Sequence, residues 1–292
     1  MRLTHIRPLN VIEALASGHT FLSAASGLVR VDKTLCMVAD DEHHLALFSY
    51  GDDRAGRLLR LLPGNLPRNK KKRKAMKPDF EILFALPSMD GQHSNLLCAL
   101  GSGSTAERMR GALIDLDSGT VAPLDLRPLF GALVPLVKET NLEGAAVSGD
   151  QLLLFNRGNM ANPDTSIFAT ALTAISGIAP PEITLVKTLA LPMIKDVSLT
   201  VTDACSLDDG QILLSAVSEV TDDSYADGPV LGAAVIVLNA DLDVMAVEPL
   251  EPTVKIEGIS ARRTASGVEL LCVSDADDPA TPSSLYSATL KI

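Results

Sequence analysis

Residues 143–159 read EGAAVSGDQLLLFNRGN: a glutamate–glycine step, a short apolar run, a turn at 148–150 and a longer apolar run. Two apolar runs separated by Ser, Gly and Asp are typical of antiparallel β-strands joined by a tight turn. Similar segments, each opened by an oxygen-bearing side chain, begin at Ser26 (SGLVRVDKTLCMVADDE), Glu81 (EILFALPSMDGQHSNLLCALGSGS), Thr202 (TDACSLDDGQILLSAVSE) and Glu257 (EGISARRTASGVELLCVSDADD). The stretch is therefore one copy of an internal repeat.

The five copies are almost evenly spaced. Their first residues lie 55, 62, 59 and 55 residues apart, and the interval from Glu257 through both termini to Ser26 is 61. Each interval has room for four short strands, and such units repeated around a ring form a β-propeller. We therefore predict an all-β, five-bladed β-propeller that forms a single domain over residues 1–292. A β-sandwich, two smaller β domains or a six-bladed ring fits the closing intervals less well.

The two ends of the chain are expected to meet in one blade. The fifth copy supplies three strands before Ile292, and the N-terminal segment 3–15 (LTHIRPLNVIEAL) can add the fourth. Such closure would hide two sheet edges and hold both termini. Helix is expected only as a short turn within 129–139.

The core must consist mainly of aliphatic side chains, because the chain has no tryptophan and its aromatic content is 3%. Cys36, Cys98 and Cys272 share the frame Leu-Cys within strand-like runs, and Cys205 lies apart from them. No CxxC pair occurs, so we expect buried, reduced thiols rather than disulfides or a zinc site. Reduced thiols, and the absence of a recognisable signal peptide or membrane span, favour a cytoplasmic protein.

Charge is distributed unevenly along the chain. It has 25 lysines and arginines against 36 aspartates and glutamates, a formal net charge of −11. Residues 68–77 (RNKKKRKAMK) hold seven of the basic residues and no acidic one, so the remainder is still more acidic. An acidic surface argues against nucleic acid or an anionic membrane as a general partner. We expect the run 68–77 to be a solvated, mobile loop, with steering of an anionic substrate as the functional alternative.

The repeat places one oxygen-bearing side chain at the same position of every blade: Ser26, Glu81, Glu143, Thr202 and Glu257. First strands line the central channel of a propeller, so these side chains are expected to converge on its axis. Converging carboxylates repel one another unless a proton or a cation lies among them. Oxygen donors without sulfur or histidine favour Ca²⁺. We predict a calcium site formed by these five residues, with a solvated channel as the alternative.

The order Ser, Glu, Glu, Thr, Glu resembles the central calcium site of the calcium-activated apyrase (soluble nucleotidase) family, which uses Ser, Glu, Glu, Ser and Glu. The resemblance implies that the five ring residues are calcium ligands; Thr202 keeps the hydroxyl, and Ile82 stands where glycine follows the other glutamates. Almost the whole chain also resembles uncharacterised bacterial propellers related to the phytase-like esterase and SdiA-regulated families. The stretches that carry this likeness are SGLVRVDKTLCMVADDE, LEGAAVSGDQLLLFNRGN and VSDADDPATPSSLY.

Polar residues follow the second strands, on the face where the ring is expected. Arg108 and Arg157, with Lys77 from the basic run, are candidates for binding substrate phosphoryl oxygens, and Glu219 and Asp275 are candidates for activating water. For each of them a solvated loop tip is the alternative.

We therefore predict a calcium-dependent hydrolase of phosphate esters or related esters. The alternative is a non-enzymatic scaffold that binds a small ligand or a protein partner and in which calcium is structural. A metal-dependent lactonase would fit a six-bladed ring, which the five intervals disfavour.

Overall fold

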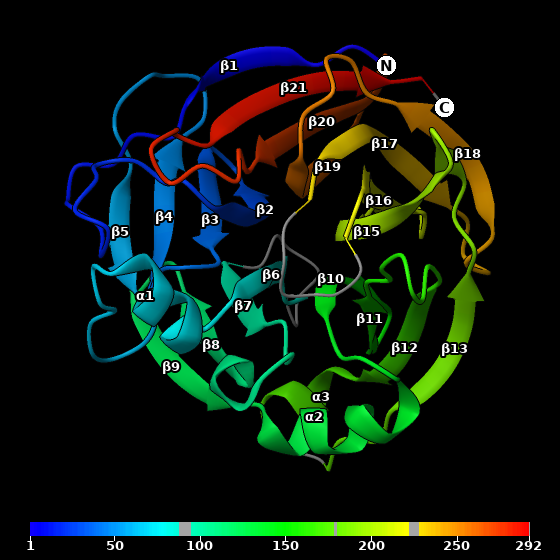
Figure 1. The fold of residues 1–292 in the computed structure, drawn as a ribbon, viewed down its shortest axis with the longest axis horizontal. Coiled ribbons are helices and arrows are strands. Elements are labelled where there is room, and N and C mark those ends of the chain that lie inside the picture. Colours follow the sequence, from blue (N-terminus) through cyan, green and yellow to red (C-terminus); the bar gives the residue numbers. More distant parts are fainter. Residues whose placement is uncertain (88–94, 178–179, 222–227, 292) are drawn as a thin grey trace.

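The computed structural model describes residues 1–87, 95–177, 180–221 and 228–291, and within them the chain forms five small sheets around a central axis (Figure 1). The predicted five-bladed propeller is confirmed. Blade 1 contains β2 (Ala25–Val31), β3 (Thr34–Ala39), β4 (His44–Ser49) and β5 (Arg57–Arg60); blade 2 contains β6 (Phe80–Ala85), β7 (Leu96–Gly101), β8 (Arg110–Asp115) and β9 (Thr120–Asp125). Blade 3 contains β10 (Leu142–Ser148), β11 (Gln151–Asn156), β12 (Thr165–Ala171) and β13 (Thr184–Leu189).

The last two blades differ in how they are completed. Blade 4 contains β14 (Met193–Ile194), β15 (Val197–Ser206), β16 (Ile212–Glu219), β17 (Val230–Leu238) and β18 (Val244–Pro249). Blade 5 contains β19 (Ile256–Thr264), β20 (Gly267–Ser274), β21 (Ser284–Leu290) and, from the other end of the chain, β1 (Thr4–Pro8). β1 pairs antiparallel with β21, which confirms the predicted closure (Figure 1). The closing strand is shorter than the segment 3–15, and β14 is too short for its pattern to predict it.

Helical structure is confined to connections. The elements are α1 (Lys70–Met76), η1 (Ala106–Arg108), α2 (Arg127–Leu133), η2 (Val134–Leu136) and α3 (Leu172–Ile175). The expected turn within 129–139 corresponds to α2 and η2. The expectation of a mobile loop at 68–77 is wrong, because Asn69 caps α1 by accepting from the Lys72 N–H at 3.1 Å and Arg73 is buried. None of the helices in the described residues is long and apolar enough to span a membrane.

The hydrophobic core lies between blades rather than at the axis. Each of the five buried clusters joins the facing sides of two neighbouring blades; one, for example, packs Phe155 and Ile167 of blade 3 against Val201 and Leu214 of blade 4. Strands buried on both faces need no polar alternation, which explains near-continuous apolar runs such as β16. Cys36, Cys98 and Cys272 are buried in second strands, as predicted, whereas Cys205 is only partly buried.

The strand that carries the repeat residue has a β-bulge in every blade; the residue skipped in the pairing is the repeat residue in blades 2 to 5 and the adjacent Gly27 in blade 1. The pairing register shifts between Ser26 and Leu28 in β2, and the same irregularity lies between 80 and 82, 142 and 144, 201 and 203, and 256 and 258. A bulge bends its strand and redirects a side chain. The oxygen-bearing residues of the repeat thus occupy equivalent, locally distorted positions.

Glycine follows the repeat residue in three blades because the next blade leaves no room for a side chain. A Cβ on Gly144 would lie 2.7 Å from the Ala204 backbone nitrogen, and one on Gly27 would lie 2.7 Å from that of Leu83. In blade 4 this position is Asp203, a buried carboxylate that accepts from the Ile259 N–H of blade 5 at 2.8 Å. Close approach between first strands therefore holds the ring together.

Gly144→Ala is expected to destabilise the fold by about 2 kcal/mol or more, because its Cβ would collide with backbone atoms of β15. Gly131→Ala, inside α2, is the matched control: its Cβ meets no atom within 4 Å, and alanine is the better helix former by about 1 kcal/mol. Urea unfolding compares the two variants. A Gly144→Ala protein as stable as the wild type would contradict the close approach of β10 to β15.

Candidate active site at the channel mouth

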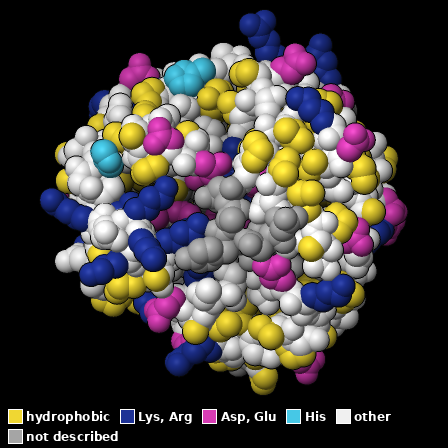
Figure 2. All heavy atoms as spheres, viewed as in Figure 1, with side chains coloured by type: hydrophobic (Ala, Val, Ile, Leu, Met, Phe, Trp, Pro, Cys, Tyr) yellow, Lys and Arg dark blue, Asp and Glu magenta, His cyan; other side chains and the backbone are white. Residues whose placement is uncertain are grey.

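One end of the channel opens into a cavity of about 160 Å³ that is lined mostly by charged side chains. Basic side chains gather beside this hollow, and acidic side chains lie within it (Figure 2). Its acidic residues are Asp40, Asp41, Asp79, Glu81, Glu139, Glu143, Glu219, Glu257, Asp275, Asp277 and Asp278; its basic residues are Lys70, Arg73, Lys74, Lys77, Arg108, Arg157 and Lys255. Carboxylates therefore outnumber cations in the pocket.

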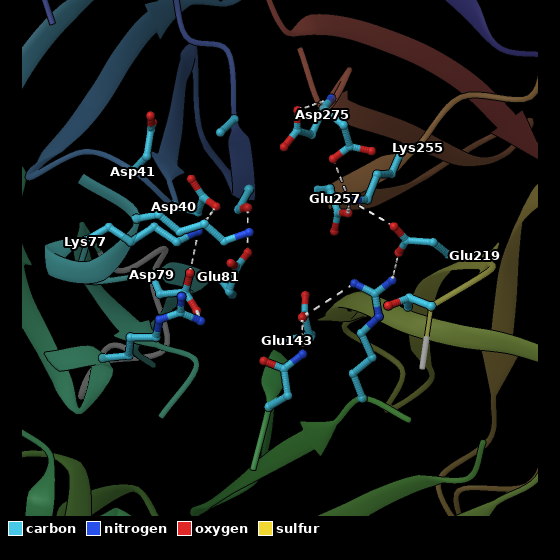
Figure 3. Close-up of a pocket in the computed structure, with 18 of the residues that line it drawn as sticks. Asp40, Asp41, Lys77, Asp79, Glu81, Glu143, Glu219, Lys255, Glu257 and Asp275 are labelled. Atoms are coloured by element: carbon cyan, nitrogen blue, oxygen red, sulfur yellow. Dashed lines mark hydrogen bonds and ion pairs between the residues drawn. The ribbon is translucent and has the colours of Figure 1, made fainter. Parts of the chain in front are cut away.

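The first of two charged groups in the pocket centres on the carboxylates of Asp40, Asp79 and Glu81 (Figure 3). Asp40 follows β3, whereas Asp79 and Glu81 flank the start of β6. One oxygen from each lies within 4.8 Å of the others, and we call these three residues the acidic cluster. The Lys77 ammonium enters it, pairing with Asp40 and, at 2.6 Å, with Asp79 Oδ1. Arg108 pairs with the other Asp79 oxygen at 2.8 Å.

Burial and neighbouring charge act in opposite directions on the acidic cluster. Burial raises the pKa of Asp40 to about 6 although Lys77 opposes the change. Burial and the neighbouring Glu143 hold the pKa of Glu81 well above its ordinary value. Burial alone would raise the pKa of Asp79, but Lys77 and Arg108 hold it below its usual range. Positive charge placed among these buried carboxylates therefore stabilises their ionised form.

The second group surrounds Arg157 and Lys255. Figure 3 shows Lys255 together with Glu143, Glu219 and Glu257. Arg157 follows β11 and reaches Glu143 Oε1 at 3.5 Å and Glu219 Oε2 at 2.5 Å. Lys255 contacts Glu257 Oε1 at 3.3 Å, Glu219 Oε1 at 3.6 Å and Asp277 Oδ1 at 2.8 Å. Four carboxylates thus share two cations.

Carboxyl groups of this second group are held toward their neutral form. Burial raises the pKa of Glu143 to about 8 against the opposing effect of Arg157, and burial also raises the pKa of Glu257. Glu257 Oε2 is buried and has no hydrogen-bond partner among the described residues. At neutral pH the pocket therefore offers a buried carboxylic acid, Glu143, and an ionised carboxylate in the acidic cluster, Asp79.

The structure brings most of the predicted ring to this pocket. Ser26, Glu81, Glu143 and Glu257 line it, and the Ser26 hydroxyl donates to Glu81 Oε2 at 2.7 Å. Thr202 does not line it: its buried hydroxyl donates to the Ile256 carbonyl at 2.6 Å and contacts Ser215 Oγ at 3.0 Å. The tight group of carboxylates in the described residues is the acidic cluster, to which the ring contributes Glu81 alone.

The other predicted site residues also line the pocket. Arg108, Arg157 and Lys77 do so with their charges already paired to carboxylates. Glu219 accepts from the Gly228 N–H at 2.9 Å in addition to its contact with Arg157. Asp275 accepts from the Asp277 N–H at 2.7 Å, and burial raises its pKa well above its ordinary value.

Sequence reasoning missed Asp79 and Lys255. Each stands two residues before a ring glutamate, as does Asn141, whose amide donates to Glu143 Oε1 at 2.7 Å. Asp79 and Lys255 lie just before β6 and β19, and both line the same pocket as the ring glutamates. A polar residue two positions before the repeat residue was the signal that could have found them.

The donor set of the acidic cluster fits a divalent cation. Its donors are carboxylate oxygens only, which suit hard ions such as Ca²⁺ and Mg²⁺. A cationic group, the Lys77 ammonium, already stands among them in place of an ion. Within the part of the chain that the structure describes, the ring glutamates do not gather within the same 4.8 Å.

Fold and pocket together define a five-bladed β-propeller with a charged site at one mouth of its channel. The chain belongs to a family of unknown function (DUF6929), whose model matches residues 21–290. None of the curated proteins compared with the chain matches it.

Solved structures similar to this chain are propellers of low identity. A protein described as a "putative glycoside hydrolase" from Parabacteroides distasonis is 11% identical, with a TM-score of 0.52 over 98% of this chain and 95% of that one. A gluconolactonase from Xanthomonas campestris is 10% identical, with a TM-score of 0.41 over 92% of this chain and 87% of that one. The first likeness supports the fold. The relation of the ring to calcium-activated apyrase stays a prediction.

Proposed function

We propose that the protein hydrolyses small phosphate esters or related esters in the mouth pocket, with a divalent cation, Ca²⁺ before others, held by the acidic cluster. The observation that carries the proposal is the combination in one cavity of three clustered carboxylates, a buried carboxylic acid and cationic side chains. When bound, a divalent ion would polarise the ester and lower the pKa of a bound water. The remaining ring residues, Ser26, Glu143 and Glu257, line the same cavity.

Glu143 is the candidate general acid. A pKa of about 8 keeps its carboxyl protonated at neutral pH, and the residue lines the cavity. A positioned carboxylic acid of this kind can protonate a leaving group. The neighbouring Asn141 amide donates to Glu143 Oε1 and holds its orientation.

Glu219 is the candidate general base. Arg157 and the Gly228 N–H hold both of its oxygens in place at the edge of the pocket. Asp275 is the weaker candidate, because its raised pKa favours the protonated form. Lys77, Arg108 and Arg157 would bind substrate oxygens once an anionic group competes with their present carboxylate partners.

Glu143→Gln is expected to lower kcat for p-nitrophenyl phosphate, or for whichever ester in a panel with bis(p-nitrophenyl) phosphate and p-nitrophenyl acetate is hydrolysed, by about 10²-fold or more. Glutamine keeps the size and the bond to Asn141 but has no acidic proton. Glu182→Gln, an exposed position, is the matched control and should not change kcat. Assays after EDTA treatment and after addition of CaCl₂, MgCl₂ or MnCl₂ test the metal. A protein that binds Ca²⁺ yet hydrolyses nothing in the panel would contradict the proposed reaction.

One observation favours a second candidate, a non-enzymatic scaffold with a structural cation. Lys77, Arg157 and Lys255 each pair with two or more carboxyl groups of the pocket, so that these contacts already stabilise the fold without a substrate. Under this alternative a cation would raise the melting temperature of the protein. Glu143→Gln would alter stability, and neither the wild type nor the variant would hydrolyse an ester.

A further inference from the structure

Lys77 is the chain's own cation in the acidic cluster. It is buried, with 8% of its surface exposed, and its ammonium pairs with Asp40 and with Asp79 Oδ1. Figure 3 shows the side chain extended into the pocket toward these carboxylates. Its partners are thus the oxygens that the proposed function assigns to a metal.

An ammonium and a divalent ion cannot share these oxygens. Two like charges a few ångströms apart in a buried site repel strongly, whatever effective dielectric is assumed. A divalent ion carries twice the charge of the ammonium and interacts correspondingly more strongly with the carboxylates, whereas Na⁺ or K⁺ brings no more charge than Lys77 already supplies. Replacing the ammonium therefore strengthens the Coulomb interaction with the carboxylates only when the incoming ion is divalent.

Lys77 also connects the cluster to α1. Its backbone N–H closes the helix by donating to the Arg73 carbonyl at 2.8 Å. The helix has two ionic anchors on adjacent residues of blade 1: Arg73 pairs with Asp41 at 2.9 Å, and Lys77 pairs with Asp40. Loss of the second anchor would leave α1 held by the first.

On the basis of the proposed function, we infer that Lys77 is a tethered competitor of the divalent cation: metal binding expels its ammonium from the acidic cluster and loosens α1. In the metal-free protein Lys77 is neutralised and unavailable to a substrate. The expelled ammonium stays at the pocket edge, where it can pair with an anionic group of the substrate. Metal and anionic substrate are then linked, each strengthening the binding of the other.

Calcium titration by calorimetry of EDTA-treated protein tests this competition. Lys77→Met keeps the length of the side chain and removes its charge, and it should bind Ca²⁺ about tenfold more tightly than the wild type or better, within the usual range of coupling between sites. Lys71→Met removes the same charge from an exposed position of α1 and should change the affinity less than twofold, about the limit expected for a screened surface charge. NaCl at matched ionic strength should not displace Lys77 in the wild type or in Lys71→Met.

Hydrogen–deuterium exchange of the wild type gives a readout that needs no variant. Amides of 70–77 should exchange faster with CaCl₂ than with EDTA, because α1 loses an anchor. Equal calcium affinity of wild type and Lys77→Met, or slower exchange of α1 with CaCl₂, would overturn the inference while leaving the metal site intact. Absence of binding to both forms would overturn the metal site and this inference together.

Discussion

Arg157→Met is expected to destabilise the protein by about 3–5 kcal/mol at pH 8, the range found when one partner of a buried ion pair is removed. The side chain of Arg157 is 10% exposed and neutralises Glu143 and Glu219, which are themselves buried. Methionine fills a similar volume but leaves two carboxylates with less positive charge. Urea unfolding followed by circular dichroism measures the loss.

The pH dependence of this loss identifies its cause. Arg157 lowers the pKa of Glu143, so its removal raises that pKa further above about 8, and at pH 5 the carboxyl is protonated in either protein. The penalty should therefore shrink as the pH falls from 8 to 5. Arg127→Met, an exposed arginine paired with Asp125, is the matched control and should leave stability unchanged. A penalty that is equal at both pH values would show that ionisation of Glu143 does not contribute to it.

Calcium is expected to stabilise the metal-free protein by about 2.7 kcal/mol at 100 times its dissociation constant and about 4.1 kcal/mol at 1,000 times. The effect should be largest above pH 8. The folded pKa values of Asp40, about 6, and Glu143, about 8, lie above the unfolded values near 4, so the folded state holds protons that the unfolded state has released. Without metal, stability therefore falls as the pH rises through this window. Scanning calorimetry from pH 5 to 8.5 measures both changes.

Much of the fold could be predicted because the propeller repeats its local chemistry. The oxygen-bearing residue, the glycine behind it and the turn between two apolar runs recur in phase, and each has one physical cause in the structure: a bulge, a close approach and a hairpin. A copy of the repeat that differs at one of these positions can still be aligned through the residues on either side of it. Thus Thr202–Asp203 takes the place of Glu–Gly, with the Asp203 carboxylate bonded to the next blade.

Features that depend on one blade alone were harder to predict. The basic run 68–77 has no apolar periodicity, and its helix depends on the Asn69 cap and on burial of Arg73 against Asp41, a residue of another segment. β14 has two residues and exists because it pairs with β15. Neither contact produces a recognisable pattern in the sequence of the segment concerned.

The repeat indicated which residues lie at the mouth of the channel, but it did not indicate which of their side chains pair with one another. Ser26, Glu81, Glu143 and Glu257 occupy the same position in their repeats, and for this reason they line one pocket. It could not show that Asp40 of blade 1 meets Asp79 and Glu81 of blade 2, or that Lys77, Arg157 and Lys255 stand between the carboxylates. Such pairings depend on how side chains from different blades share a small buried volume.

The melting temperature of EDTA-treated protein at pH 8, measured before and after addition of CaCl₂, tests most directly whether the mouth pocket holds a cation. Glu81→Gln, which removes one carboxyl group from the acidic cluster, and Glu182→Gln, which removes one from the exposed surface, are measured beside the wild type. We predict a calcium-dependent rise in the wild type and in Glu182→Gln that is abolished or strongly reduced in Glu81→Gln. No rise with CaCl₂, or an equal rise in all three proteins, would contradict a cation site at this mouth of the propeller.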